Sequence, residues 1–442
     1  MSWKEYQQRK KSWPFRIPRG VLLGLLLMAV SIPALLTLYR SNPDPEIPSA
    51  LPFDSVELLN ALTPEILSQP VTEVTVNHGL KRFRATLSLD TELQRFIQKK
   101  LRAYRVDWGG VAVIDSGTGE VLALASHSEK EAGAGPLALR ATFPAASIFK
   151  IVTATAALDQ NLVGRTSSIA YRLRSRRDEG TIRPSDISKP GGNNVATVEQ
   201  AFAKSENKVF GQLGLRVGGA TLLEYAGRFG FNARIPFELA IGVSLAGSSD
   251  TEETDEDEDA VDSARMAAGF RGATLSPLHG ALIASAVVNG GRMVTPRIVQ
   301  RVTDDAGTEV YRSGSTVWTR PMSEETAREL RLMMAKTIAR GGTAHRGFRR
   351  LENDRVLGRL DIGGKTGSLT GQNPPGKNLW FVGYAAGPNR SIAIGMVLVH
   401  HRIWRVKPAQ LSREILDSFF SRPTLIGTGR KETTRRKETT DG

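Results

Sequence analysis

The spacing of apolar residues predicts both helices and strands along most of the chain. A helix is expected over 87–101, where apolar residues recur every three or four positions after a capping residue, Asp90 or Thr91. Two β-rich runs within 110–125 are separated by Asp115-Ser-Gly-Thr-Gly119, a sequence typical of a hairpin turn. The folded part of the chain therefore begins with elements of both kinds.

Helical spacing and strand-like runs of apolar residues both continue farther along the chain. Helices are predicted over 198–214 with a break at 204–207, and over 276–289, 323–340 and 408–420. Strands are predicted over 360–368, 378–386 and 391–399. Outer helices and clustered antiparallel strands favour an α+β fold, an antiparallel sheet flanked by helices. Residues 250–259 include eight carboxylates and are expected to form a solvated loop.

The N-terminal segment predicts a membrane anchor. Residues 20–39 carry no charge, and twenty helical residues span about 30 Å, the thickness of a bilayer core. The basic residues of 1–19 are expected to remain in the cytoplasm, which places the rest of the chain outside a single-pass span of the inner (cytoplasmic) membrane. A cleaved signal peptide is the alternative, but no Ala-x-Ala-like site follows. Residues 40–84 then form a proline-containing linker or short pedestal.

Composition narrows the classes of function. The chain of 442 residues has no cysteine, and its 6 histidines show no metal-ligand spacing, so neither a metal nor another cofactor is expected. The net charge of +14 does not predict a nucleic-acid partner, because much of the excess lies in the N-terminal segment and the tail. That tail, 422–442, contains Arg-Lys-Glu-Thr-Thr twice and is predicted to be disordered.

A candidate nucleophile and base lie in Phe143-Pro-Ala-Ala-Ser-Ile-Phe-Lys150, just before an apolar run. A helix is predicted to begin just after Pro144. Ser147 and Lys150 are three positions apart, so they would share one face of this helix. A serine hydroxyl needs a neighbouring base, and a lysine can be that base if burial or a second cation lowers its pKa. The pair is weak evidence alone, because one such spacing is expected by chance.

Ser205-Glu-Asn207 is the second candidate element. Its hydroxyl can relay a proton, and the amide of Asn207 can hold a peptide group of a substrate. It falls at the predicted break in the 198–214 helix, where side chains can leave the helix surface.

Gly364-Lys-Thr-Gly-Ser368 is the third element and opens a predicted strand. Lys365 supplies positive charge, Thr366 can bind a carboxylate, and Gly367 lets a substrate lie along the strand edge. An attacked carbonyl develops negative charge, which the backbone N–H groups of Ser147 and Ser368 can stabilise. The three elements in this order, each in a fitting local structure, are predicted to form one functional site.

These motifs resemble those of penicillin-binding proteins. Ser147-Ile-Phe-Lys150, Ser205-Glu-Asn207 and Lys365-Thr-Gly367 have the family's order. Segments such as Gly341-Gly-Thr-Ala344 and Trp380-Phe-Val-Gly-Tyr384 also match. The likeness covers 85–421 and is to the monofunctional, membrane-anchored (class B-like) transpeptidases without their usual large non-catalytic domain. It implies the fold shared by serine β-lactamases and penicillin-binding transpeptidases, with the catalytic domain in the periplasm or extracytoplasmic space.

The resemblance also implies the catalytic roles. Ser147 would attack the D-Ala-D-Ala bond of a peptidoglycan stem peptide, and Lys150 would activate it. Ser205 would carry a proton to the leaving amine, and Asn207 would orient the substrate amide. The amine of a neighbouring stem would then form the cross-link.

Ligands and partners follow from the same resemblance. Lys365 and Thr366 would receive the terminal carboxylate of the stem peptide, and β-lactams would acylate Ser147 as mimics of that substrate. A membrane-embedded glycan polymerase or another cell-wall synthesis protein is a further candidate partner.

Three other functions stay open. A serine β-lactamase shares all three motifs but must activate water for deacylation. A D,D-carboxypeptidase differs only in using water as the acceptor, which motifs do not reveal. From a different class, a morphogenetic scaffold could carry the same residues without using them.

Overall fold

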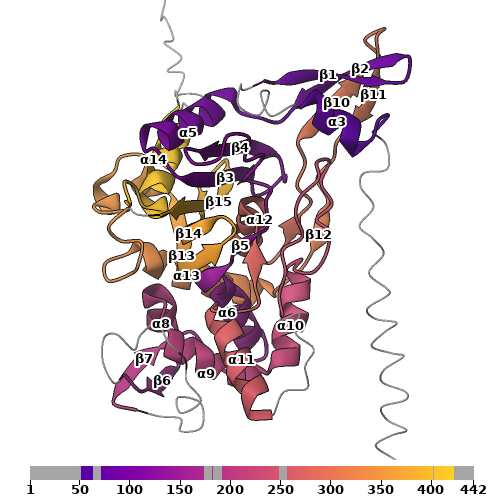
Figure 1. Ribbon diagram of the computed structural model, residues 1–442. Helices are drawn as coiled ribbons and strands as arrows, with labels where there is room; N and C mark the ends of the chain where they lie inside the picture. Colours follow the sequence, from indigo (N-terminus) through magenta and orange to yellow (C-terminus); the bar gives the residue numbers. More distant parts are fainter. Residues whose placement is uncertain are drawn as a thin grey trace, which may run out of the picture. The chain divides into compact units, whose positions relative to one another are not determined.

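A five-stranded antiparallel sheet forms the centre of the computed structural model, which describes residues 51–62, 71–173, 182, 192–247, 256–401 and 403–422. Its strand order is β13-β14-β15-β3-β4 (Figure 1). The strands are β3 (Trp108–Asp115), β4 (Val121–Ser128), β13 (Asp361–Gln372), β14 (Pro375–Ala386) and β15 (Ser391–His400). Because β13 is the terminal strand, one side of it has no strand partner within the described part of the chain.

Helices cover both faces of this sheet. On one face lie α5 (Thr91–Ala103) and α14 (Pro408–Phe420), whose apolar side chains pack against alternate residues of β3 and β15. The other face is covered by α12 (Pro277–Val288), which is buried along nearly its whole length. It lies so close to β15 that a Cβ at Gly395 would be 1.9 Å from the Pro277 carbonyl oxygen. The close approach therefore requires glycine there.

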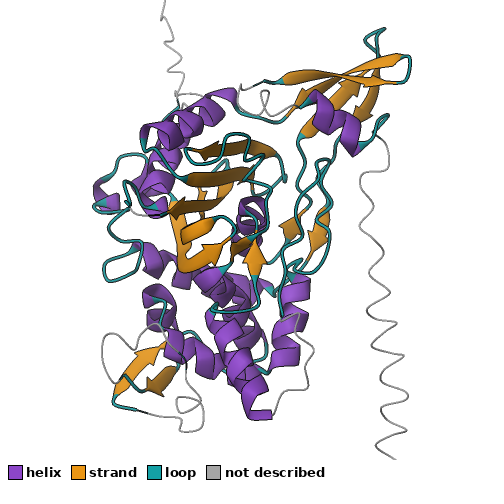
Figure 2. Ribbon diagram, viewed as in Figure 1, coloured by secondary structure: helices purple, strands orange, loops and turns teal. Residues whose placement is uncertain are grey.

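Several helices gather beside β13 and α12 (Figure 2). They are α6 (Lys150–Asp159), α8 (Val198–Lys204), α9 (Asn207–Val217), α10 (Gly219–Arg228), α11 (Glu256–Ala268) and α13 (Glu324–Ile338). Short strand pairs join them to the rest: β5 (Phe143–Pro144) with β8 (Thr274–Leu275), β6 (Ser168–Tyr171) with β7 (Asn194–Thr197), and β9 (Met293–Val294) with β12 (Val317–Thr319). Short 3₁₀ turns are η1 (Ala146–Phe149), η3 (Leu351–Asn353) and η4 (Leu357–Arg359).

A second sheet, here called the N-terminal sheet, combines distant parts of the chain. Its order is β1-β2-β10-β11, from β1 (Glu73–His78), β2 (Lys81–Leu87), β10 (Val299–Thr303) and β11 (Glu309–Arg312). One face is apolar and packs near α3 (Ser55–Ala61). The domain boundary expected at residue 85 falls inside β2, and the pairing with β10 was not anticipated from the sequence.

Most elements expected from the sequence are present in the structure. The helix predicted over 87–101 is α5 with Asp90 as its cap, and the predicted break at 204–207 separates α8 from α9. Two expectations change in detail. Ser147 lies on the 3₁₀ turn η1 rather than on the α-helix, which begins at Lys150. The acidic segment 250–259 is not wholly a loop, because α11 begins at Glu256.

The predicted ends of the chain lie outside the described residues. This applies to the basic segment 1–19, the anchor 20–39, residues 40–50 and 63–70 of the linker 40–84, and the tail after residue 422. The rest of the linker includes α3, β1 and the first part of β2. Within the described ranges, none of the helices is both long and apolar enough to cross a bilayer. The anchor therefore stays a prediction.

Candidate active site

Ser147 is presented by a sharp turn between β5 and α6. Pairing of β5 with β8, and a 2.8 Å hydrogen bond from Trp380 Nε1 to the Pro144 carbonyl, hold the segment before the turn. Ala146 has a φ of 49°, a left-handed conformation that costs a non-glycine residue energy and marks functional turns. As a result Ser147 is partly exposed, whereas Ile148 beside it is buried.

Lys150 begins α6 and is completely buried. Its Nζ lies 2.8 Å from Ser147 Oγ, 2.7 Å from Asn207 Oδ1 and 2.7 Å from the main-chain oxygen of Ala268. The last two atoms can only accept hydrogen bonds. A neutral amine has two N–H groups, so both are used by these acceptors, and its lone pair then faces the hydroxyl of Ser147. The geometry therefore suits proton transfer from Ser147 to Lys150.

Ser205 and Asn207 are separated by the junction of α8 and α9. A capping box of Thr197 and Gln200 starts α8, and Ser205 ends it with φ 59° and ψ 41°, in the left-handed region. Glu206 then caps α9 by accepting a hydrogen bond from the Lys208 amide. This reversal directs Ser205 toward Lys365 and Asn207 toward Lys150.

Lys365 lies on β13 and is also completely buried. Its Nζ donates 2.9 Å hydrogen bonds to Ser205 Oγ and to the carbonyl of Thr366. Thr366 itself is partly exposed, and its hydroxyl lies 2.5 Å from the hydroxyl of Thr343. The strand thus places a lysine beside the second motif and a threonine hydroxyl where a ligand can reach it.

Gly367 brings β13 into contact with the turn that carries the nucleophile. A Cβ at this position would lie 3.3 Å from the backbone nitrogen of Ser147 and 3.3 Å from the Cβ of Ala146, closer than most side-chain carbons approach other atoms. The next residue, Ser368, is exposed. The two backbone N–H groups expected to stabilise an oxyanion, those of Ser147 and Ser368, therefore belong to adjacent segments. Their joint action stays a prediction.

The two buried lysines have different electrostatic states. Burial, and then the charge of Lys365, hold the pKa of Lys150 well below its usual value, while Glu206 opposes this shift. Burial lowers the pKa of Lys365 to about 7. The charge of Lys365 disfavours a second charge on Lys150, and the two acceptor-only partners of Lys150 leave its lone pair facing Ser147, so Lys150 is the neutral partner. Lys150 can then act as the base while Lys365 keeps positive charge for an anionic ligand.

Sequence reasoning missed two aromatic residues in this site. The Nζ of Lys150 lies 5.7 Å from the ring centre of Phe210, and that of Lys365 lies 5.5 Å from the ring centre of Phe202. The two rings are 6.1 Å apart. Each phenylalanine is three positions from Ser205 or Asn207, so helical spacing around the second motif was the available signal.

Two further groups were also missed. The carbonyl of Ala268, at the end of α11, could not be found from the sequence, because a main-chain acceptor has no residue preference. Thr343 lies in Gly341-Gly-Thr-Ala344, a family-like segment to which the sequence assigned no role. Both groups orient residues that the sequence did identify.

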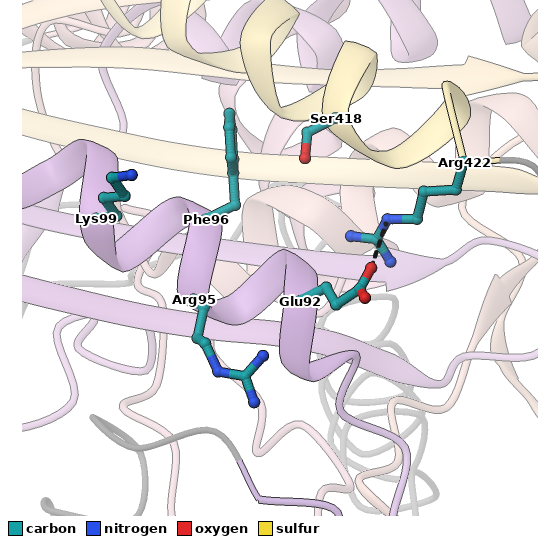
Figure 3. A pocket seen from close by; sticks show the side chains of 6 residues that line it. All are labelled: Glu92, Arg95, Phe96, Lys99, Ser418 and Arg422. Atoms are coloured by element: carbon teal, nitrogen blue, oxygen red, sulfur yellow. Dashed lines mark ion pairs between the residues drawn. The ribbon is translucent and has the colours of Figure 1, made fainter.

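A separate depression lies between α5 and the end of α14 (Figure 3). It has a volume of about 400 Å³ and is lined by Glu92, Arg95, Phe96, Lys99, Ser418 and Arg422. An ion pair of 3.5 Å between Arg422 and Glu92 crosses it. None of the predicted site residues lines it. Among the described residues, no group of three or more His, Asp or Glu side chains is arranged to hold a metal ion.

Comparison with known proteins gives consistent matches. The model of the penicillin-binding protein transpeptidase domain matches residues 109–417. Stage V sporulation protein D of Bacillus subtilis is 26% identical over 70% of this chain and 48% of its own length. Peptidoglycan D,D-transpeptidase PbpA of Mycolicibacterium smegmatis is 25% identical over 59% of this chain and 50% of its own length. The chain thus spans about half the length of these curated relatives.

A solved structure has the same fold. Penicillin-binding protein A from Mycobacterium tuberculosis, determined as an imipenem acyl-enzyme complex, superposes with a TM-score of 0.59 at 20% identity. The match covers 76% of this chain and 79% of that chain.

Proposed function

Because the chain belongs to the family of penicillin-binding protein transpeptidase domains, we propose that it is a serine D,D-transpeptidase that cross-links peptidoglycan stem peptides. Ser147 Oγ attacks the carbonyl between the two terminal D-alanines, and its proton passes to Lys150. The C–N bond breaks, and the leaving D-alanine takes a proton through Ser205. The amine of a neighbouring stem peptide then attacks the ester, which forms the new amide and returns the Ser147 hydroxyl.

The observation that carries this proposal is the environment of the Lys150 amine. It is buried, its pKa is depressed, and its two acceptor-only partners turn the lone pair toward Ser147. A buried lysine that only stabilised the fold would be expected to pair with a carboxylate that keeps it charged, because an unpaired buried charge is costly. The Lys150 amine instead contacts uncharged acceptors. The arrangement suits a general base near neutral pH.

The expected class of ligand follows from the residues of β13 that lie in the site. Lys365 and Thr366 offer a cation and a hydroxyl at the strand edge, which suits the terminal carboxylate of a D-Ala-D-Ala peptide. A β-lactam presents a carboxylate near a strained amide, and the named tuberculosis protein carries imipenem as an acyl-enzyme. We therefore expect β-lactams to acylate Ser147 here.

Location and partners belong to the same proposal. An anchor at 20–39 with basic residues before it would hold the catalytic domain outside the cytoplasm, where stem peptides are cross-linked. A membrane-embedded glycan polymerase is the partner that would supply uncross-linked strands. Protease protection of membrane vesicles tests the topology.

Labelled penicillin tests the chemistry. The full chain should retain a fluorescent penicillin through denaturing electrophoresis, with the adduct mapped to the peptide that contains Ser147, and Ser147→Ala should not be labelled. An unlabelled wild-type protein would refute the proposal. Rapid release of hydrolysed penicillin would instead identify a β-lactamase.

The acceptor is tested with a stem pentapeptide and an added amine. Cross-linked product supports the transpeptidase, whereas free tetrapeptide as the sole product identifies a carboxypeptidase. If a cell carrying Ser147→Ala kept normal cross-linking and shape, the scaffold function would replace both.

A further inference from the structure

Thr343 is held at the site by its main chain. After α13 ends, Gly341 adopts a φ of 89°, a conformation available mainly to glycine, and the chain turns back toward α8. There the Thr343 amide donates a 3.0 Å hydrogen bond to the carbonyl of Ala203, in the last turn of α8. A substitution of the Thr343 side chain therefore leaves this hydrogen bond intact, because the bond joins two main-chain groups.

The hydroxyl of Thr343 completes a closed series of contacts between α8, β13 and the segment after α13. It lies 2.5 Å from the hydroxyl of Thr366 on β13. The neighbour of Thr366, Lys365, donates to Ser205, which lies two positions after Ala203. Thr343 therefore connects the end of α8 with the strand that carries the third motif, and its side chain is exposed toward solvent.

We propose that Thr343 is a positioning residue for the carboxylate of the ligand. The proposal rests on the proposed function, since it concerns the same site. Each of the two hydroxyls has one proton, and their contact uses one of them. In the proposed arrangement Thr343 Oγ1 donates to Thr366 Oγ1, so the proton of Thr366 points away from the pair toward a carboxylate beside Lys365. Without Thr343 Oγ, the hydroxyl of Thr366 rotates freely and loses this preference.

The test compares a ligand with and without the charge. The second-order rate of Ser147 acylation is measured by intact-mass spectrometry with benzylpenicillin and with its methyl ester. Thr343→Val removes the hydroxyl at constant shape, and we expect its rate with benzylpenicillin to fall about tenfold, with a change below twofold for the ester. Thr343→Ser keeps the hydroxyl and should stay within about threefold of wild type.

A double-mutant cycle separates positioning from independent binding. If Thr343 acts through Thr366, Thr343→Val should slow the reaction little when Thr366→Val is already present. Thr75→Val on the exposed face of β1 is the matched control and should match wild type.

Three outcomes would overturn the proposal. They are an unchanged rate in Thr343→Val, an equal loss with penicillin and ester, and additive effects in the cycle. Acylation of wild type is measured in the same series. Its absence would refute the proposed function and this proposal with it, whereas labelled wild type with an unchanged Thr343→Val refutes only the role of Thr343.

Discussion

Replacing Asn207 by aspartate should disable the base while hardly changing the shape of the site. Asn207 Oδ1 lies 2.7 Å from the Nζ of Lys150 and accepts one of its hydrogens. Asn207→Asp puts a carboxylate in the same place. The new charge favours the ammonium form of the lysine, so the pKa of Lys150 rises and the lone pair needed by Ser147 is occupied by a proton.

The distance gives the size of the effect. At 2.7 Å and an effective dielectric constant of about 20, two opposite unit charges attract by about 6 kcal/mol. Even a third of this, about 2 kcal/mol, raises the pKa of Lys150 by about 1.5 units. At a pH below the wild-type pKa of Lys150, the neutral fraction and the acylation rate would both fall about thirtyfold.

The assay is the rate of acylation by benzylpenicillin methyl ester as a function of pH, because this ligand has no carboxylate for Lys365 to bind. In Asn207→Asp the acidic limb of the profile should move to higher pH by at least about 1.5 units, with recovery in alkaline buffer. Asn207→Leu removes the hydrogen bond without adding charge, so it should lower the rate without that upward shift. If Asn207→Asp lowered the plateau but kept the wild-type acidic limb, Lys150 would not be the base.

Three other predictions concern charge, packing and acid stability. Because the pKa of Lys365 is about 7, acylation by a carboxylate-bearing penicillin should decline above that pH. Lys365→Arg keeps its charge and should move this alkaline limb upward; an unmoved limb would show that another group titrates. Gly269 has a φ of 85°, and a Cβ there would lie 2.0 Å from the Ala146 carbonyl oxygen. Gly269→Ala should therefore lower the melting temperature and the acylation rate much more than Gly133→Ala, which has a φ of 78° and open space; equal losses would contradict the packing argument. Burial lowers the pKa of His279 from 6.5 to about 4, so between these values the unfolded chain binds a proton that the folded chain does not. The folded state should lose about 1.4 kcal/mol per pH unit as the pH falls, and urea unfolding of His279→Phe should lack this component. Glu238, whose pKa burial raises to about 7, acts in the opposite direction in both proteins, so only the difference between them tests His279.

The residues that meet in the site could be predicted because their positions are specified locally. The i to i+3 spacing that places Ser147 beside Lys150 survives on a 3₁₀ turn followed by an α-helix, so the mistaken helix start did not affect the pairing. The break between Ser205 and Asn207 was equally visible, because the apolar stripe is interrupted there. Local pattern thus predicted which residues point into the site.

The rest depends on contacts between distant segments. Val299–Thr303 has a strand-like pattern, but nothing in it specifies pairing with β2, far upstream in the chain. The carbonyl of Ala268 reaches Lys150 only because α11 ends against η1, where Gly269 allows close packing. The acidic residues from Glu256 onward were assigned to a loop, yet acidic side chains are also favourable in the first turn of a helix.

The N-terminal sheet limits where the chain can be shortened. A fragment that began after Leu87 would remove β1 and β2 but keep β10, whose main-chain groups now pair with β2. The bare strand would expose unpaired amides and the apolar side chains of Val299 and Val302, a surface that promotes aggregation. Shortened versions for crystallisation or inhibitor screening should therefore begin ahead of Glu73.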